Sequence, residues 1–403
     1  MRKNEPLISV KDAMSLVLKE AMDFGHEEID FKDSLGRVLR ENIKADRDMP
    51  PFDRVSMDGI ALKTSVFENG KRQFKIENVQ AAGSEQLTLK NDDHCIEAMT
   101  GAVLPKGTDA VIPFELIQIE NGTAQVNLDE IRFFQNIHKK GLDRKKNEVL
   151  IPINTKISPA EIGVLATVGK SMVRVAALPK VAIISTGDEL VEVKETPTPY
   201  QIRKSNVHTL DTLMKRFEMN AHLFHISDSK EQLRIKIASL LEDYDVLMFS
   251  GAVSKGKFDY LPEILNDLGV IKLFHKVRQR PGKPFWFGKK NQTTIFAYPG
   301  NPVSTLVSCL KYFVPWLQKG LCIEYENSGF AILAENVHFK PELTYFLQVK
   351  TINKDGKLMA FPMAGNGSGD LANLTNNDGF LELPSNRTEF SKGEVFPLIP
   401  YRS

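Results

Sequence analysis

The sequence predicts a multidomain protein of α/β and β type, in which a three-layer α/β domain with a mostly parallel sheet accompanies β-rich lobes. Between residues 179 and 322, apolar strand-like runs alternate with segments of helical periodicity, which is typical of a parallel sheet with helical crossovers. From residue 74 to 174, short β-type runs alternate with Gly and Asn turns. From about residue 323, two strand-like runs flank an Asp-Gly turn, which indicates a β module.

The composition excludes several classes of protein. The 403 residues include 42% hydrophobic and 26% charged residues, which excludes a disordered chain or a coiled coil. The 52 Lys and Arg residues nearly balance the 51 Asp and Glu residues, so no overall field attracts nucleic acid or an anionic membrane. Cys95, Cys309 and Cys322 are too dispersed for a disulfide framework or structural zinc. No secretory signal and no run of 18 apolar residues is present, so we expect a cytoplasmic protein.

The first element is expected to be a helix that begins after Ser9. Ser9 and Asp12 form a capping-box pattern, and Val10, Ala13 and Val17 then fall on one face. The paired prolines in the following segment DMPPFDRVSMDG exclude a helix there. That segment is therefore predicted to consist of turns and short strands.

Polar sequences follow the predicted strands of the α/β domain. KVAIIST leads into STGDEL, AHLFHI precedes Asp228, DVLMFSGA runs into SGAVSKGKFDY, and IKLFHKV runs into RQRPGKP. A later strand ends in YPGNPVS, and a helix is predicted where Leu233, Ile237, Leu240 and Leu241 recur at helical spacing. Because ligands bind just beyond the carboxyl ends of strands in open parallel sheets, we expect the site at these ends.

The segment SGAVSKG is a candidate phosphate loop. Gly251 and Gly256 would let the backbone approach a ligand, and amides at a helix N-terminus favour anions. Gly-rich loops between strand and helix are also common turns, so both interpretations remain open. The segment is not a Walker loop, because no Gly-Lys-Ser/Thr follows it.

Residues 268–323 contain no Asp or Glu, although the chain average would give about seven in that length. Lys289 and Lys290 are best explained as a solvated turn. The cations in and beside RQRPGKP differ, because two prolines and a glycine fix the backbone that carries them. A rigid cationic strand end suits an oxyanion or a phosphate. The nine cations of the stretch are Lys272, Lys276, Arg278, Arg280, Lys283, Lys289, Lys290, Lys311 and Lys319.

Carboxylates occupy the neighbouring strand ends, namely Asp188, Glu189, Asp228 and Asp259. Each taken alone could cap a helix. Together with the cations they would suit Mg2+ and a phosphate ester, since magnesium prefers a few carboxylates plus phosphate oxygens. They could equally accept hydrogen bonds from the amino groups of a heterocycle. The eight histidines show no metal-ligand spacing, and no Ser-His-Asp pattern supports a covalent nucleophile.

Six segments together resemble the molybdopterin molybdenumtransferase family, which includes bacterial MoeA and the C-terminal domain of gephyrin. These segments are PPFDRVSMDGIAL, TGAVLPKGTDAVI, STGDEL, SGAVSKGKFDY, PGKPFWFG and YPGNPVS. The resemblance covers nearly the whole chain. It implies an N-terminal elongated lobe formed by 1–50 and 141–178, and an inserted β-rich lobe at 51–140. It further implies a molybdopterin-binding-type α/β domain at 179–322 and a C-terminal β-barrel-like domain at 323–403.

The resemblance also implies an activity. Such enzymes insert molybdate, a substrate, into adenylylated molybdopterin and release molybdenum cofactor and AMP, with Mg2+ as the divalent cation. They are homodimers whose cleft is shared between subunits. The resemblance further implies contacts with the molybdopterin adenylyltransferase and with acceptor molybdoenzymes. Nucleic acid and membranes are not expected as partners.

Comparison with the family motifs assigns roles to individual residues. Asp58, Glu189, Asp228 and Asp259 would be catalytic, and Glu189, Asp228 and Asp259 would bind the metal. Lys276, Arg280 and Lys283 would bind the anion. The full set expected to bind substrate is Thr100, Asp143, Ser250, Gly251, Ser254, Lys276, Arg280, Gly282, Lys283, Pro299, Gly300, Asn301, Pro302, Ser304 and Ser368.

The chain departs from the family pattern at Leu142, Ala252, Asp370 and Lys204, and Lys204 replaces an aspartate common in the IYDSN motif. Two alternatives remain open. The related adenylyltransferase would consume ATP, but its usual GGTG-type loop is SGAVS here. A scaffold without activity would tolerate the loss of the acidic residues, which this chain retains.

Overall fold

The computed structural model describes residues 7–251, 253, 260–323, 329–363 and 365–402. The chain forms two compact units. The first comprises Met1–Arg40, Asn154–Ser158 and Met172–Ser403, and the second comprises Glu41–Ile153 and Pro159–Ser171. Ser254 and Asp259, both predicted site residues, lie outside the described residues, as does Ala252.

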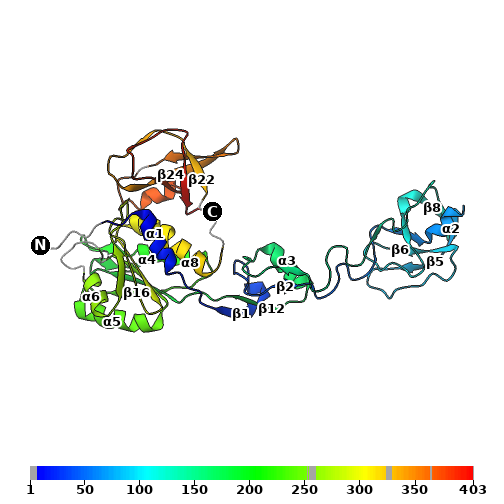
Figure 1. Ribbon diagram of the computed structural model, residues 1–403, viewed down its shortest axis with the longest axis horizontal. Helices are drawn as coiled ribbons and strands as arrows, with labels where there is room; N and C mark the ends of the chain where they lie inside the picture. Colours follow the sequence, from blue (N-terminus) through cyan, green and yellow to red (C-terminus); the bar gives the residue numbers. More distant parts are fainter. Residues whose placement is uncertain (1–6, 252, 254–259, 324–328, 364, 403) are drawn as a thin grey trace. The chain divides into compact units, whose positions relative to one another are not determined.

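A six-stranded sheet forms the centre of the first unit (Figure 1). Its order is β16 (His222–Ile226), β13 (Val181–Thr186), β17 (Val246–Ser250), β21 (Thr293–Tyr298), β20 (Trp286–Lys290) and β18 (Ile271–His275). The first four strands run parallel, β20 is antiparallel to both of its neighbours, β21 and β18, and β18 therefore runs in the same direction as the first four. Strands β20 and β21 must be antiparallel because only Asn291 and Gln292 separate them, a length that permits a hairpin but no crossover. The predicted mostly parallel sheet is confirmed.

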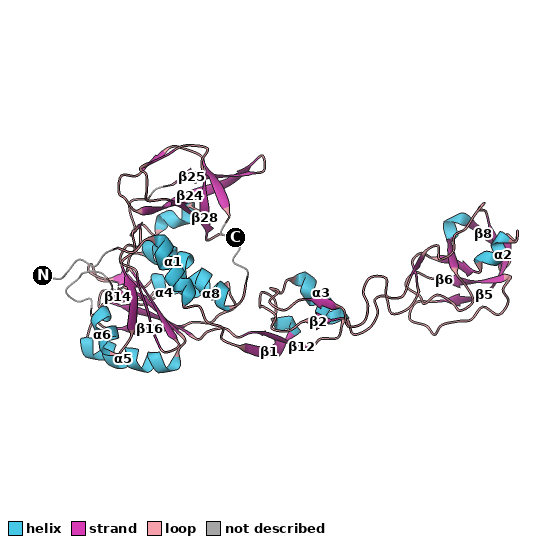
Figure 2. Cartoon of the chain, in the orientation of Figure 1, coloured by secondary structure: helices cyan, strands magenta, loops and turns pink. Residues whose placement is uncertain are grey.

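Helices cover both faces of this sheet, which confirms the predicted three layers (Figure 2). Because side chains alternate along a strand, Val181 and Ile183 pack on one side and Ala182 and Ile184 on the other. The first face carries α1 (Val10–Lys19), α4 (Asn206–Lys215), α7 (Pro302–Ser308) and α8 (Val314–Gly320). The second face carries α5 (Lys230–Asp243) and α6 (Leu261–Asp267).

The N-terminal helix begins as its sequence predicts. The Ser9 hydroxyl oxygen accepts a hydrogen bond from the backbone N–H of Asp12 at 3.0 Å, which satisfies one of the unpaired donors of the first turn. Val10, Ala13 and Val17 are the buried residues of this helix. The predicted N-cap at Ser9 and the apolar face are therefore both confirmed.

A π-helical turn, η3 (Cys309–Phe313), connects α7 directly to α8. Its four apolar or aromatic residues are buried, and the Tyr312 ring stacks on Phe285 with 4.7 Å between centroids. The Phe313 ring packs near Trp316 at 5.6 Å. π-helical turns are rare in proteins overall, and those that occur are often found at functional sites.

The C-terminal module is a β-sheet that closes on itself. Strand β24 (Thr344–Lys354) pairs with both β25 (Lys357–Pro362) and β26 (Gly379–Leu383), and the ring continues through β22 (Phe330–Leu333) and β28 (Val395–Pro400). Asp355 and Gly356, with φ values of 51° and 75°, form the predicted hairpin turn between β24 and β25. The short strand β19 (Gln279–Arg280), from the α/β domain, pairs in parallel with β24.

Short elements complete the first unit. They are η1 (Phe31–Asp33), η4 (Ala372–Asn376) and the strand pairs β1 (His26–Asp30) with β12 (Met172–Ala176), β14 (Leu190–Val191) with β15 (Ile202–Arg203), and β23 (Val337–His338) with β27 (Glu389–Phe390). No helix among the described residues is both long enough and apolar enough to cross a bilayer.

The second unit contains a six-stranded sheet ordered β7, β4, β6, β5, β9, β8. Its strands are β7 (Ala110–Pro113), β4 (Gly59–Leu62), β6 (His94–Ala98), β5 (Gln73–Gln80), β9 (Thr123–Val126) and β8 (Ile117–Glu120). The remaining elements are α2 (Thr64–Glu68), α3 (Pro159–Thr167), η2 (Phe114–Leu116), and the pairs β3 (Arg54–Val55) with β10 (Ile137–His138) and β2 (Ile43–Lys44) with β11 (Val149–Ile151). This unit is β-rich, as the sequence predicts.

Candidate functional site

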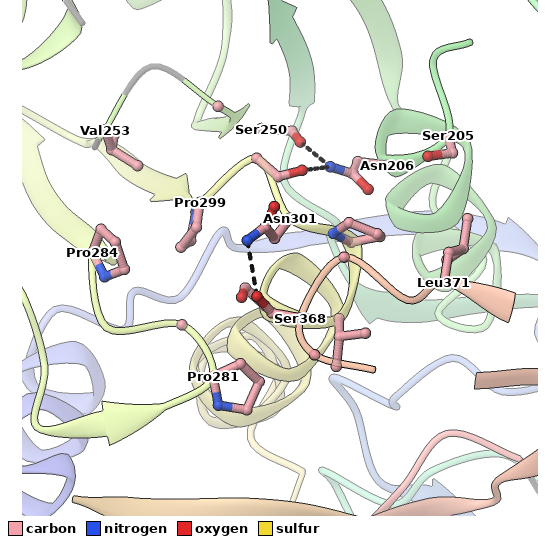
Figure 3. Close-up of a pocket in the computed structure, with 18 of the residues that line it drawn as sticks. Ser205, Asn206, Ser250, Val253, Pro281, Pro284, Pro299, Asn301, Ser368 and Leu371 are labelled. Carbon is pink, nitrogen blue, oxygen red and sulfur yellow. Dashed lines mark hydrogen bonds between the residues drawn. The ribbon is translucent and has the colours of Figure 1, made fainter. Parts of the chain in front are cut away.

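A cavity of about 1210 Å³ lies at the carboxyl ends of β13, β17 and β21 in the first unit (Figure 3). Loops of the C-terminal module line its other side. The predicted site residues that line it are Glu189, Asp228, Ser250, Gly251, Arg280, Gly282, Lys283, Pro299, Gly300, Asn301, Pro302, Ser304 and Ser368. The rule that ligand sites form at these strand ends therefore leads to the largest cavity described.

Asn206 connects two of the strand-end loops. It is the first residue of α4, and its amide nitrogen donates hydrogen bonds to the Ser250 hydroxyl at 2.8 Å and to the Gly300 carbonyl at 2.7 Å (Figure 3). Gly251 follows with a φ of 109°, a conformation that favours glycine. Because α4 is packed into the core through Val207 and Leu210, Asn206 holds both loops against a rigid element.

A second amide connects the α/β domain to the C-terminal module. Asn301, which precedes α7, donates from its side chain to the Ser368 hydroxyl at 2.8 Å (Figure 3). The backbone N–H of Val303 donates to the Ser368 carbonyl at 3.2 Å. Within the preceding turn, the Thr305 hydroxyl donates to the Pro299 carbonyl at 2.6 Å. The two domains therefore share one wall of the cavity.

The cationic edge of the cavity carries Arg280 and Lys283, and both side chains are exposed. The Arg280 guanidinium lies 5.8 Å from the centroid of the Phe339 ring, which stacks on Tyr345 at 4.2 Å. Burial raises the pKa of Tyr345, and the nearby Arg280 charge opposes that rise. Arg280 is thus held by rings of the C-terminal module while its charge remains available to a bound anion.

The acidic side of the cavity carries Glu189 and Asp228. The Asp228 backbone N–H donates to the Asp188 carboxylate at 3.2 Å, and the Glu189 carboxylate folds close to Gly187. Among the described residues, no three His, Cys, Asp or Glu side chains converge as a metal-binding group. The third predicted carboxylate, Asp259, is outside that set of residues.

Lys276 lies in the same segment as Arg280 and Lys283 but does not line the cavity as described. Its φ is 76°, and its backbone N–H donates to the Phe285 carbonyl at 2.9 Å. This left-handed backbone conformation, uncommon for a residue with a side chain, could not be read from the sequence. The structure therefore groups two of the three predicted anion-binding cations.

Asp58, Thr100 and Asp143 belong to the second unit. The Asp58 carboxylate accepts hydrogen bonds from the backbone N–H of Thr100 at 2.6 Å and from its hydroxyl at 2.7 Å. These two bonds hold the pKa of Asp58 below its usual value. The Asp143 carboxylate lies 2.8 Å from the Nε2 atom of His138. Asp58 and Thr100 thus meet despite their sequence separation.

Asn206 and Lys204 are among several cavity-lining residues that the sequence did not identify as site residues. The Lys204 side chain is only 8% exposed, and its ammonium group lies 2.5 Å from a carboxylate oxygen of Glu192. Burial of the His225 ring, together with the positive charge of Lys204, lowers the pKa of His225. Their motif, IRKSN, departs from the family pattern, and this departure is the signal that the sequence offers.

Comparison with known proteins accounts for the whole chain. Residues 8–169 match the MoeA N-terminal region (domain I and II), residues 182–319 a probable molybdopterin binding domain, and residues 331–401 the MoeA C-terminal region (domain IV). The chain is 39% identical to the molybdopterin molybdenumtransferase of Synechocystis over 98% of this chain and 100% of the relative. It is 31% identical to that of Bacillus subtilis over 100% of this chain and 96% of the relative.

Solved structures agree with the fold. A crystal structure of the molybdopterin biosynthesis moeA protein from Pyrococcus horikoshii matches with a TM-score of 0.85 and 27% identity, over 99% of this chain and 100% of that one. A second such structure matches with a TM-score of 0.81 and 25% identity, over 98% and 100%. The chain therefore belongs to the molybdopterin molybdenumtransferase family, transferases of molybdenum cofactor biosynthesis.

Proposed function

We propose that this transferase inserts molybdate into adenylylated molybdopterin and releases molybdenum cofactor and AMP. The observation that carries the proposal is one cavity whose lining combines Arg280 and Lys283 with Glu189 and Asp228. Two anionic substrates, one a phosphate ester and one an oxyanion, need local cations to bind side by side. The cavity volume of about 1210 Å³ is ample for both.

The loops of the α/β domain would bind the pterin and phosphate portions of the substrate. Ser250 offers a hydroxyl group and Gly251 brings backbone close to the cavity, while Asn206 fixes the position of both loops. Arg280 and Lys283 would bind molybdate, with Ser304 and Ser368 as additional hydroxyl donors that line the same cavity. Lys276 is proposed to contribute to the positive potential from outside the wall. Ser254 and Asp259 complete the proposed set from the sequence alone.

Mg2+ would be held by Glu189 and Asp228. Hard carboxylate oxygens beside phosphate-binding loops fit the preference of this ion for a few carboxylates plus phosphate oxygens. When bound, the ion would neutralise charge on the bridging phosphate oxygens. Glu189 and Asp228 would also orient the phosphates, and no side-chain nucleophile takes part.

Asp58, Thr100 and Asp143 are proposed to complete the site from the other subunit of a homodimer. The support is the family resemblance together with the two hydrogen bonds from Thr100 that fix the orientation of the Asp58 carboxylate. The protein is proposed to act in the cytoplasm, where acceptor molybdoenzymes and the molybdopterin adenylyltransferase would be its further partners.

The proposal is tested by incubating the purified protein with adenylylated molybdopterin, molybdate and Mg2+ and measuring AMP. AMP release that requires molybdate is expected. ATP consumption without molybdate would instead indicate an adenylyltransferase. No turnover of either kind, with a protein that still binds a partner, would favour a scaffold.

A further inference from the structure

The segment that carries Arg280 and Lys283 is closed into a compact loop by its own backbone. The N–H of Val277 donates to the Lys283 carbonyl at 2.9 Å, and the N–H of Phe285 donates to the Gly282 carbonyl at 3.2 Å. Strand β19 attaches the same segment to β24 of the C-terminal module. These bonds define the shape of the loop backbone. The position of the loop also depends on the buried side chain against which its inner side packs.

That side chain belongs to Gln279, and it has no exposed surface. Its amide nitrogen donates to the Pro281 carbonyl at 3.2 Å and lies 3.5 Å from the Ser308 hydroxyl oxygen. Its amide oxygen accepts a hydrogen bond from the Tyr312 hydroxyl at 2.5 Å. A buried amide with both ends bonded has one defined orientation, because any rotation leaves polar atoms unpaired.

The π-helical turn η3 supplies the donor that sets this orientation. Tyr312 is fully buried and its ring stacks on Phe285, so only its hydroxyl can reach a polar partner. Burial raises the pKa of Tyr312 well above its usual value, so its hydroxyl stays protonated and able to donate. The Pro281 carbonyl can only accept a hydrogen bond, so the Gln279 nitrogen must face the loop, and its oxygen then faces the Tyr312 hydroxyl, which donates to it.

Gly282 brings the loop into direct contact with this amide. Its φ is 92°, and a Cβ atom placed there would lie 2.6 Å from the Gln279 amide nitrogen and 2.7 Å from the Ser308 hydroxyl oxygen. No side chain fits in that space, so the backbone between Arg280 and Lys283 rests on Gln279 itself. A movement of the amide would therefore move the backbone that carries both cations.

We infer that Gln279, oriented by Tyr312, is a positioning residue that sets the placement of Arg280 and Lys283 for oxyanion binding. Gln279 lines the cavity, but its amide atoms are engaged by Pro281, Ser308 and Tyr312, so the role inferred for it is indirect. The effect of Gln279 and Tyr312 passes through the Pro281 carbonyl and Gly282 to the two cations. This inference rests on the proposed function, because it assumes that the two cations bind molybdate.

The test compares Tyr312→Phe and Gln279→Met with the wild-type protein. Tyr312→Phe keeps the ring and removes only the hydroxyl, and Gln279→Met keeps the length and removes the amide. The matched control is Tyr298→Phe, because Tyr298 is also fully buried and stacked on Phe285 but its hydroxyl lies beside Cys309 instead. Thermal unfolding of each variant shows whether the fold survives.

The readouts are molybdate binding by titration calorimetry and the molybdate dependence of AMP release. For Tyr312→Phe we expect the molybdate Kd and KM to rise about threefold to tenfold, the size expected for one hydrogen bond, with kcat changed less. Gln279→Met should act in the same direction, and Tyr298→Phe should match the wild type. A protein that is folded and has an unchanged molybdate Kd in both test variants overturns the inference. A wild-type protein that neither binds molybdate nor releases AMP overturns the proposed function, and with it the inference.

Discussion

Replacement of Asn206 by alanine tests whether the strand-end loops depend on one amide. The change removes two hydrogen bonds, at 2.8 Å to Ser250 and 2.7 Å to Gly300, without touching Arg280 or Lys283. Each such bond contributes about 0.5–1.5 kcal/mol net, which gives about 1–3 kcal/mol for the pair. Because Asn206 is only half-buried, water can replace part of this, and the lower end of the range is expected.

A loss of about 1.4 kcal/mol corresponds to a tenfold fall in kcat/KM for adenylylated molybdopterin. The assay is AMP release at saturating molybdate, with the pterin substrate varied. His208→Ala is the control, because His208 lies in the same helix, is exposed and does not line the cavity as described. A kcat/KM for Asn206→Ala within twofold of the control would refute the reasoning that Asn206 fixes both loops.

Three further predictions follow from individual contacts. Gly282→Ala is expected to lower the free energy of unfolding by about 1–3 kcal/mol and to weaken molybdate binding, because the φ of 92° and the contacts at 2.6 and 2.7 Å leave no room for a Cβ atom. Denaturant unfolding measures the stability, and calorimetry measures the binding. Wild-type values in both measurements would count against the close contact. Thr100→Val is expected to raise the pKa of Asp58 towards its ordinary value, because the hydroxyl donor is lost while the backbone donor remains. Carbon NMR titration of the Asp58 carboxyl group measures this pKa directly. An unchanged pKa would contradict the assigned cause. Because burial lowers the pKa of His225 below 6.5, the folded protein binds fewer protons at this residue than the unfolded chain does, so the contribution of His225 to stability is present above pH 6.5 and is lost as the pH falls through the folded pKa. The apparent Tm of His225→Gln should therefore fall less steeply with acidification than that of the wild type. Equal slopes for the two proteins would contradict the prediction.

The sequence was sufficient to predict the α/β sheet, because its strands are continuous apolar runs and its helices show clear periodicity. It also predicted that the strand ends would converge, since parallel strands direct their carboxyl ends to one edge. The antiparallel pairing of β18 with β20 was harder to predict from the sequence. IKLFHKV reads like any other buried strand, and only the two-residue turn between β20 and β21 determines the direction of its neighbour.

The details of the candidate site depend on contacts that no local pattern encodes. Lys276, for example, has a positive φ and does not line the cavity as described, although Arg280 and Lys283, which do, lie within the same eight residues. Gln279 appears in the sequence as one polar residue among basic ones, and its burial results from η3 and β24 packing around it. The role of Asn206 is visible only in the folded chain, where its side chain bonds to two loops that are distant in sequence.

The pairing of β19 with β24 has a consequence for how the two domains can evolve. Gln279 and Arg280 belong by sequence to the α/β domain, yet their backbone completes the edge of the C-terminal sheet. A recombined gene that joined this α/β domain to an unrelated C-terminal module would leave that edge strand without its hydrogen-bonding neighbour. The two domains are therefore expected to be inherited as a single segment.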